Sequence, residues 1–106
     1  MAGKVHMRNG LEIDEEGTKR WYLDDRLHRL DGPAVECTFG NKLWYINGKK
    51  HREDGPAAEW ATGTIGWYLD DKFLGRNAAG FWALWNRLTP EQQNNLNLHM
   101  WMAKYV

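Results

Sequence analysis

The sequence has one cysteine, no excess of either charge and no long apolar run, and each absence excludes a class of protein. Because Cys37 is alone, no disulfide can form within the chain, which excludes a secreted disulfide scaffold. Lys and Arg number 14, as do Asp and Glu, so the basic surplus of a bulk nucleic-acid binder is missing. No stretch resembles a signal peptide or is long enough to cross a membrane. We therefore expect a protein of the reducing cytoplasm.

Tryptophan and glycine are abundant, with seven and eleven residues respectively. Large rings favour strands, and glycines favour the tight turns that join them. A hydrophobic fraction of 42% argues against disorder, and 106 residues fit one domain. We predict a single β-rich domain over residues 1–106.

A unit of 23 residues is repeated along the chain, as the spacing of Gly17, Gly40 and Gly63 shows. A Trp-Tyr pair recurs in the same register, at Trp21-Tyr22, Trp44-Tyr45 and Trp67-Tyr68. The second half of the unit reads His-Arg-x-Asp-Gly-Pro-Ala and occurs at residues 28–34 and 51–57. Identities this regular indicate an array in which one supersecondary unit stacks on the next.

Both ends of the array are incomplete. Residues 4–16 form a half-repeat in which His6 has the spacing to Gly10 that His28 has to Gly32. The third unit lacks the His-Arg-x-Asp-Gly-Pro-Ala segment. Terminal repeats are often atypical because they cap an exposed sheet edge. We divide the chain into a half-repeat (4–16), two repeats (17–39 and 40–62), a partial repeat (63–76) and a helical cap (77–106).

Each unit predicts a β-hairpin closed by a tight turn. Aromatic and β-branched residues precede Asn47-Gly48, the dipeptide that best tolerates the positive φ angles of a type I′ turn. Asp24-Asp25 and Asp70-Asp71 take this position in the other units, and we expect looser turns there because Asp tolerates positive φ less well. The returning strands are predicted at residues 26–30 and 49–52, and the strands after them at residues 34–38 and 57–61.

The Asp-Gly-Pro segment is predicted to form a bend after each returning strand. Asp can bond backbone amides ahead of it, Gly relieves steric crowding, and Pro fixes φ and removes a donor. We expect His or Arg to pack across this bend. The residues assigned to this structural turn are His28, Asp31, Gly32, Pro33, His51, Asp54, Gly55 and Pro56.

The hydrophobic period changes after the third unit. Phe81, Leu84, Trp85 and Leu88 lie at helical spacing within residues 77–88. Thr89-Pro90-Glu91-Gln92 is a helix start. Two apolar faces follow it, one with Leu96, Met100 and Ala103 and one with Leu98, Trp101, Met102 and Tyr105. The sequence thus predicts an α+β fold, an antiparallel β-meander of about 2.5 hairpin repeats followed by two C-terminal α-helices.

Some side chains in the sequence belong to types that act in catalysis or bind metal ions. His28 and His51 are each followed three residues later by an Asp, a pattern compatible with acid–base chemistry or metal binding. Because the pairs recur in successive units, we interpret them as structural. Cys37 has no evident His partner, and no glycine-rich loop has the lysine and helix of a phosphate-binding loop. We expect no enzyme activity, no catalytic or metal-binding residue and no cofactor.

Tandem Trp-Tyr, Asn-Gly-Lys and His-Arg-x-Asp-Gly-Pro-Ala segments resemble MORN-type repeats. They resemble more closely the His-Arg-x-Asp-Gly-Pro-Ala variant found in small proteins of bacteriophages and large DNA viruses. The resemblance covers residues 17–72, extends weakly to 4–16 and leaves out the helical tail. It implies a β-hairpin array and a viral origin, with a binding or scaffolding surface but no particular activity.

The aromatic rows and nearby cations are the candidate binding residues, namely Trp21, Tyr22, Trp44, Tyr45, Trp67, Tyr68, Lys49 and Arg52. Trp, Tyr and Arg dominate binding energy at protein interfaces, so we predict a protein-interaction module. With the viral resemblance, this becomes a small phage protein that binds and inhibits a host protein, such as a defence factor. The alternative is a sponge-like binder of a nucleotide or other small ligand that stacks on exposed rings.

Two further points stay open at the level of sequence. The tryptophans could instead pack in the core against the C-terminal helices. An open sheet edge or those helices could also pair two copies of the chain into a homodimer.

Overall fold

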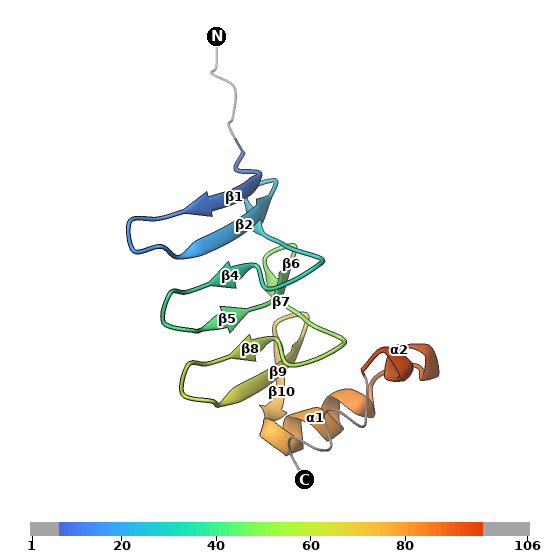
Figure 1. The fold of residues 1–106 in the computed structure, drawn as a ribbon. Helices are drawn as coiled ribbons and strands as arrows, with labels where there is room; N and C mark the ends of the chain where they lie inside the picture. The colour runs from blue at the N-terminus through green and yellow to red at the C-terminus, as the bar shows by residue number, and fades with distance from the viewer. Residues whose placement is uncertain (1–6, 97–106) are drawn as a thin grey trace.

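Two helices close one end of a stack of β-hairpins in the computed structural model, which describes residues 7–96 (Figure 1). All strand pairings between the described residues are antiparallel. The predicted α+β class, a meander of hairpins followed by two C-terminal helices, is confirmed.

Ten strands form two sheets in the described part of the chain. They are β1 (Gly10–Ile13), β2 (Lys19–Leu23), β3 (Arg26–Leu27), β4 (Val35–Glu36), β5 (Lys42–Leu43), β6 (Tyr45–Ile46), β7 (Lys49–Lys50), β8 (Ala58–Glu59), β9 (Ile65–Leu69) and β10 (Lys72–Arg76). The main sheet has the order β1-β2-β4-β5-β8-β9-β10, with β3 paired to β2, and β6 pairs with β7 separately.

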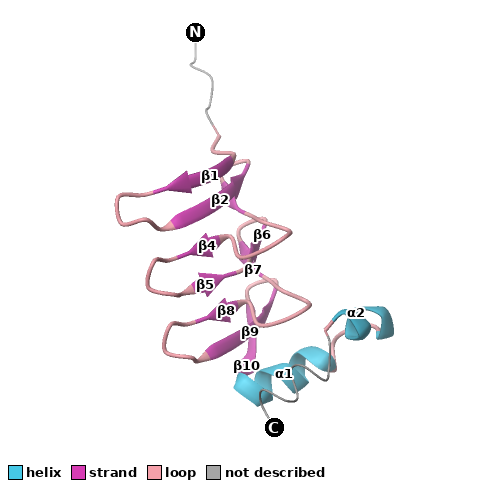
Figure 2. Ribbon diagram, viewed as in Figure 1, coloured by secondary structure: helices cyan, strands magenta, loops and turns pink. Residues whose placement is uncertain are grey.

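Two kinds of hairpin alternate along the chain and point in different directions. The first hairpins, β1–β2, β4–β5 and β8–β9, stack as the main sheet with their loops on one side of the molecule (Figure 2). The second hairpins, β2–β3, β6–β7 and β9–β10, branch away from it. The returning strands β3 and β7 are shorter than predicted because the His and Arg after each of them bond the neighbouring unit.

The turns of the second hairpins have one geometry in all three units. Asp24 and Asp25 have φ angles of 48° and 68°, and Asp70 and Asp71 have 47° and 68°, beside 50° for Asn47. The prediction of looser Asp-Asp turns is therefore wrong. The carboxylate of Asp71 accepts the backbone N–H of Lys50 at 2.8 Å, and Asp25 is bonded in the same way to the unit before it. This bond to the preceding unit compensates for the positive φ of the second Asp.

Histidine joins each unit to the next. The Nδ1 atom of His28 accepts the backbone N–H of Asn47 at 2.9 Å, and His51 accepts that of Asp70 at 3.0 Å. In the N-terminal half-repeat, Asn9 accepts the N–H of Asp24 at 2.9 Å. Asn9 thus holds the position of the histidine, whereas the predicted equivalent, His6, lies outside the described residues. The alignment of the half-repeat with the full repeats did not identify Asn9, because the half-repeat lacks the loop that follows His28 and His51.

The hydrophobic core lies at the helical end of the stack. It contains Ile65, Trp67, Phe81, Leu84, Leu88 and Leu96. Helix α1 (Asn77–Trp85) packs on β9 and β10, and ends three residues before the predicted limit. Helix α2 (Pro90–Asn95) begins with the predicted capping box, in which Thr89 and Gln92 exchange side-chain-to-backbone bonds. The apolar faces predicted beyond Leu96 lie outside the described residues.

Two exposed ion pairs make the N-terminal hairpin sensitive to acid. Hydrogen bonds from Arg20 and Arg8 hold the pKa of Asp14 and of Asp25, respectively, below the ordinary value of 3.8. A carboxylate with a lowered folded-state pKa stabilises the fold above 3.8, and this contribution is lost as the pH falls through the lowered pKa. We expect the amides of β1 and β2 to lose exchange protection below pH 3.8 earlier than those of β9. Arg20→Gln should bring the pKa of Asp14 closer to 3.8, as NMR titration would measure, while the backbone N–H groups of Thr18 and Glu16 still lower it. Simultaneous loss of protection in all three strands would contradict the expectation.

Candidate functional site

Two arginines cover two of the three repeated tryptophans. The guanidinium carbon of Arg29 lies 3.8 Å from the ring centroid of Trp21, and that of Arg52 lies 4.0 Å from the ring centroid of Trp44. Only 18% of the Arg52 side chain is exposed. A partly buried cation over an indole face is a favourable contact of about 1 kcal/mol or more. We call each such set of arginine, tryptophan and Asp-Gly-Pro an arginine clamp.

The Asp-Gly-Pro segment serves as the receptor of the arginine. Arg52 donates from Nε to the Asp54 carboxylate at 2.9 Å and from Nη1 to the Pro56 carbonyl at 3.1 Å. A Cβ atom at Gly55 would lie 2.6 Å from the guanidinium carbon, so glycine allows the close approach. The first clamp repeats these contacts, with Arg29 bonded to Asp31 and Pro33 beside Gly32.

This arrangement corrects the interpretation of the turn. Asp31 and Asp54 accept from arginine side chains, whereas we predicted bonds to backbone amides. The glycines are needed for the approach of the guanidinium and not for a positive φ, which neither has. The expectation that His or Arg packs across the bend agrees with the position of Arg29 and Arg52.

A row of alternating charges runs beside the clamps. Lys19, Glu36, Lys42 and Glu59 face one another on neighbouring strands of the main sheet. Arg52 also bonds Glu59 at 3.1 Å, and Arg29 lies 3.7 Å from Glu36. Opposite charges on adjacent strands stabilise the pairing. The guanidinium of Arg52, a candidate binding residue, is therefore paired with carboxylates of the same chain.

Helix α1 replaces the clamp in the third unit. Trp67 is completely buried, and its ring lies edge-on to Phe81 at 5.7 Å. Gly80 lets the helix backbone lie directly against this indole. Of the three repeated tryptophans, Trp67 thus packs in the core against the helices. Trp21 and Trp44 are half-buried under arginines.

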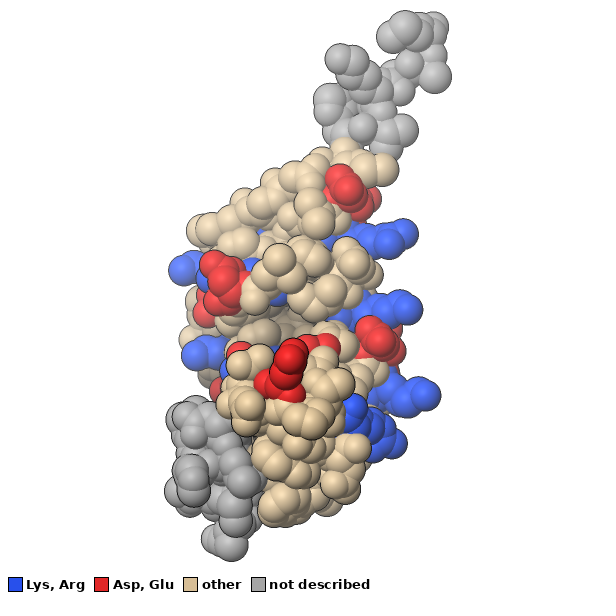
Figure 3. Space-filling model, turned by 90° about the vertical axis from the view of Figure 1, so that its right-hand side faces the viewer, with Lys and Arg blue, Asp and Glu red and all other residues tan. Residues whose placement is uncertain are grey.

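The tyrosines of the candidate set belong to the other face, whereas the one lysine of the set, Lys49, lies opposite Ile46 in the β6–β7 hairpin. Each Tyr follows its Trp in the chain, so the two side chains point to opposite sides of the strand. Arg8 covers Tyr22 at 4.2 Å and Lys50 covers Tyr68 at 5.0 Å, while burial raises the pKa of Tyr45. Lys49 is exposed, as are the residues at its position in the other units, Arg26 and Lys72. Figure 3 shows Lys and Arg side chains in a row along one edge of the molecule.

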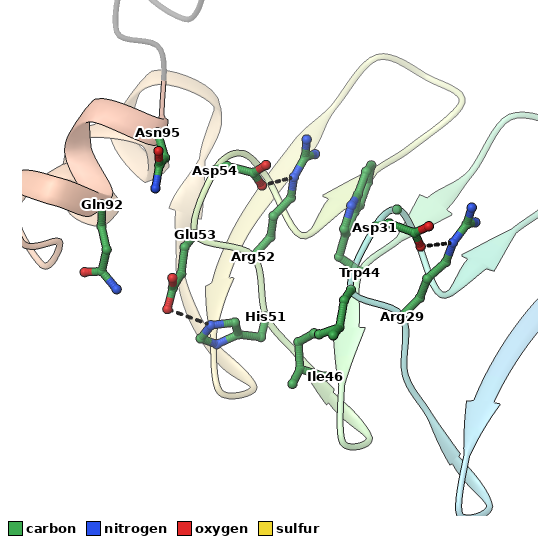
Figure 4. Close-up of a pocket in the computed structure, with 12 residues that line it drawn as sticks. Arg29, Asp31, Trp44, Ile46, His51, Arg52, Glu53, Asp54, Gln92 and Asn95 are labelled. Carbon is green, nitrogen blue, oxygen red and sulfur yellow. Dashed lines mark hydrogen bonds and ion pairs between the residues drawn. The ribbon is translucent and has the colours of Figure 1, made fainter. Parts of the chain in front are cut away.

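The candidate residues therefore do not form one site. Trp44 and Arg52 meet on one face, and Tyr45 and Lys49 belong to the other hairpin arm. What the structure does bring together is an open groove of about 920 Å³ on the side of the clamps (Figure 4). Its walls are the loops of the two clamps and helix α2.

The groove combines residues from distant parts of the chain. Trp44 and Ile46 lie in it, and Gln92 and Asn95 reach it from α2. His51 also lines it and contacts Glu53 at 3.3 Å. Sequence reasoning missed Leu30, Ile46, Glu53, Gln92 and Asn95. Leu30 and Glu53 had a signal, since each is the variable position of an otherwise repeated motif.

Neither helix has the length and apolar composition that a membrane crossing requires, within residues 7–96. In the same range, no group of three or more His, Cys, Asp or Glu side chains converges to hold a metal ion. Comparison with protein-family models, with curated proteins and with solved structures finds no match for this chain.

Proposed function

We propose that this chain is a non-enzymatic protein-binding scaffold that docks its partner on the groove between the clamp loops and α2. The observation that carries the proposal is the exposure of an apolar side chain at the rim of the groove. Leu30 is 82% exposed at the rim, next to Asp31, whose side chain is 86% exposed. An apolar side chain beside an acidic one, at the edge of a groove with an aromatic residue in it, fits a protein surface better than a single small molecule.

The rigidity of the two clamp loops supports the same proposal. Arg29 and Arg52 hold their loops by bonds that start and end within one turn. A loop that is ordered before binding loses little conformational entropy when a partner docks. The clamps thus let variable residues at the rim contribute to binding without loss of the shape of the loop.

The sharper form of the proposal adds the resemblance to viral repeat proteins. In this form, the chain is a small phage protein that acts in the cytoplasm of the bacterial host and inhibits a host protein, such as a defence factor. Its support is the repeat motif at residues 28–34 and 51–57 together with the rim that those loops present.

Site-specific crosslinking tests the docking surface. A photoreactive amino acid at position 30 should capture one partner in stoichiometric yield from host lysate. Phe39 provides a matched control, because it is apolar, 83% exposed and placed in a loop between β4 and β5, away from the groove. The purified partner should lose activity when the wild-type chain is added and keep it with Leu30→Asp. Equal capture from positions 30 and 39, or none from position 30, would contradict the proposal.

The alternative of a small-ligand or nucleotide binder has one observation in its favour. The groove has the volume of small-molecule sites and contains Trp44, His51 and Arg52. Against it, the guanidinium of Arg52 covers the indole that a base would stack on. A thermal-shift panel of cyclic and linear nucleotides decides between the two, since stabilisation by any of them that is lost in Trp44→Leu would favour the alternative.

A further inference from the structure

The outer edge of β1 lacks a neighbouring strand among the described residues. In the other units, the equivalent strands β4 and β8 are each paired on both sides. β1 carries neither of the residues that often protect an edge, lysine or proline, and all four of its residues are exposed. Leu11 and Ile13 are 47% and 58% exposed.

The register shows which backbone groups are directed outward. Trp21, which faces Leu11, donates its N–H to Ala34 and accepts from His28, so its backbone groups point away from β1. In an antiparallel pair, such a residue faces a partner whose own groups also point away. Leu11, and by alternation Ile13, therefore direct their N–H and C=O groups to the outer edge, while those of Glu12 point to β2.

The other end of the main sheet is obstructed. Helix α1 follows β10 and lies so close that a Cβ atom at Gly75 would be 2.9 Å from the backbone nitrogen of Gly80. Pairing of β1 with β10 of another copy, which would build an open filament, is therefore disfavoured. A strand that pairs with its own copy about a two-fold axis gives a closed dimer.

We infer that β1 is a dimerisation edge, which pairs antiparallel with β1 of a second copy of this chain. A two-fold axis through Leu11 places the two Leu11 side chains together and Glu12 opposite Gly10 of the partner subunit, so no two carboxylates face each other. It also places Asp14 opposite Arg8 of the partner subunit. Asp14 also pairs with Arg20 and Arg8 with Asp25 within the chain, but the Asp14 and Arg8 side chains stay 38% and 49% exposed, so opposite charges face each other in this register.

Light scattering on the full chain tests the inference. A concentration series should show a rise from 12.4 kDa to twice that mass. Leu11→Lys puts two cations at the axis and should leave a single-chain mass at every concentration. Ile13→Pro removes an outward N–H that β2 does not use, and should also give the single-chain mass, whereas the control Ile13→Val should keep the dimer.

Amide exchange separates this edge from other modes of association. In the dimer, the amides of Leu11 and Ile13 should be protected, and in Leu11→Lys they should exchange freely while Glu12 stays protected in both. A wild-type mass of one chain throughout the series would overturn the inference, as would a dimer that persists in Leu11→Lys. The proposed docking groove does not depend on these results, because its lining includes no residue of β1.

Discussion

Gly80→Ala should destabilise the protein by about 3 kcal/mol, although alanine is the better helix former. A Cβ atom at this position would overlap Cδ1 of Trp67 and the carbonyl oxygen of Gly75, and it would lie 2.7 Å from the Gly75 carbonyl carbon. Neither neighbour can move away, since one is a completely buried ring and the other is backbone. Helix α1 would have to shift from β9, and the core of the helical end would open with it. Urea unfolding followed by circular dichroism measures the difference.

Ala79→Gly is the matched control for this substitution. Ala79 is exposed in the same helix, one residue earlier. Its replacement by glycine should cost only the helix propensity of about 1 kcal/mol. If Gly80→Ala were neutral or stabilising, as propensity alone predicts, the close packing of α1 on Trp67 would be wrong.

Trp67→Ala should cost about 3–5 kcal/mol, the range for removal of a fully buried large ring. The ring is 0% exposed and packs edge-on against Phe81, so its loss leaves a cavity between the last unit and α1. The edge-on pair alone contributes about 1 kcal/mol of this. Because α1 takes the place of the missing clamp, the effect should appear as loss of the helical end together with the third hairpin.

Two other substitutions serve as comparisons for Trp67→Ala. Trp60 is 39% exposed at the end of β8, and Trp60→Ala should cost about 1 kcal/mol or less. Trp67→Phe keeps a ring beside Phe81 and should retain much of the stability if Trp67→Ala does not fold at all. Equal costs for Trp60→Ala and Trp67→Ala in equilibrium unfolding would contradict the assigned core.

Local signals in the sequence predicted the regular parts of the fold. The 23-residue spacing predicted the hairpin array, Asn47-Gly48 predicted one turn, and Thr89 with Gln92 predicted the start of α2. These features depend on neighbours in the chain. Even the Asp-Asp turns were predicted in the right place, and only their geometry was wrong, because the compensating bonds come from the preceding unit.

The clamps and the groove depend on contacts that no short pattern reports. The repeated glycine of Asp-Gly-Pro looked like a turn residue, but it is there because a guanidinium lies on it. That guanidinium is in turn held over Trp44, which is in the preceding strand segment. Gln92 and Asn95 reach the groove because α1 crosses the end of the stack and places α2 on the side of the clamp loops. Such placements follow from tertiary packing, so the candidate site was predicted only in part.

Asp-Gly-Pro is repeated because it receives an arginine, and a double-mutant cycle on Gly55 and Arg52 tests this role most directly. In the wild-type background, Gly55→Ala should cost about 2 kcal/mol, because the new Cβ displaces the guanidinium from Asp54 and Pro56. In the Arg52→Ala background, the same change should cost less than about 0.5 kcal/mol, giving a coupling energy of about 1.5 kcal/mol in urea unfolding. Equal costs of Gly55→Ala in the two backgrounds would contradict the account, since the glycine would then be required for the backbone turn alone.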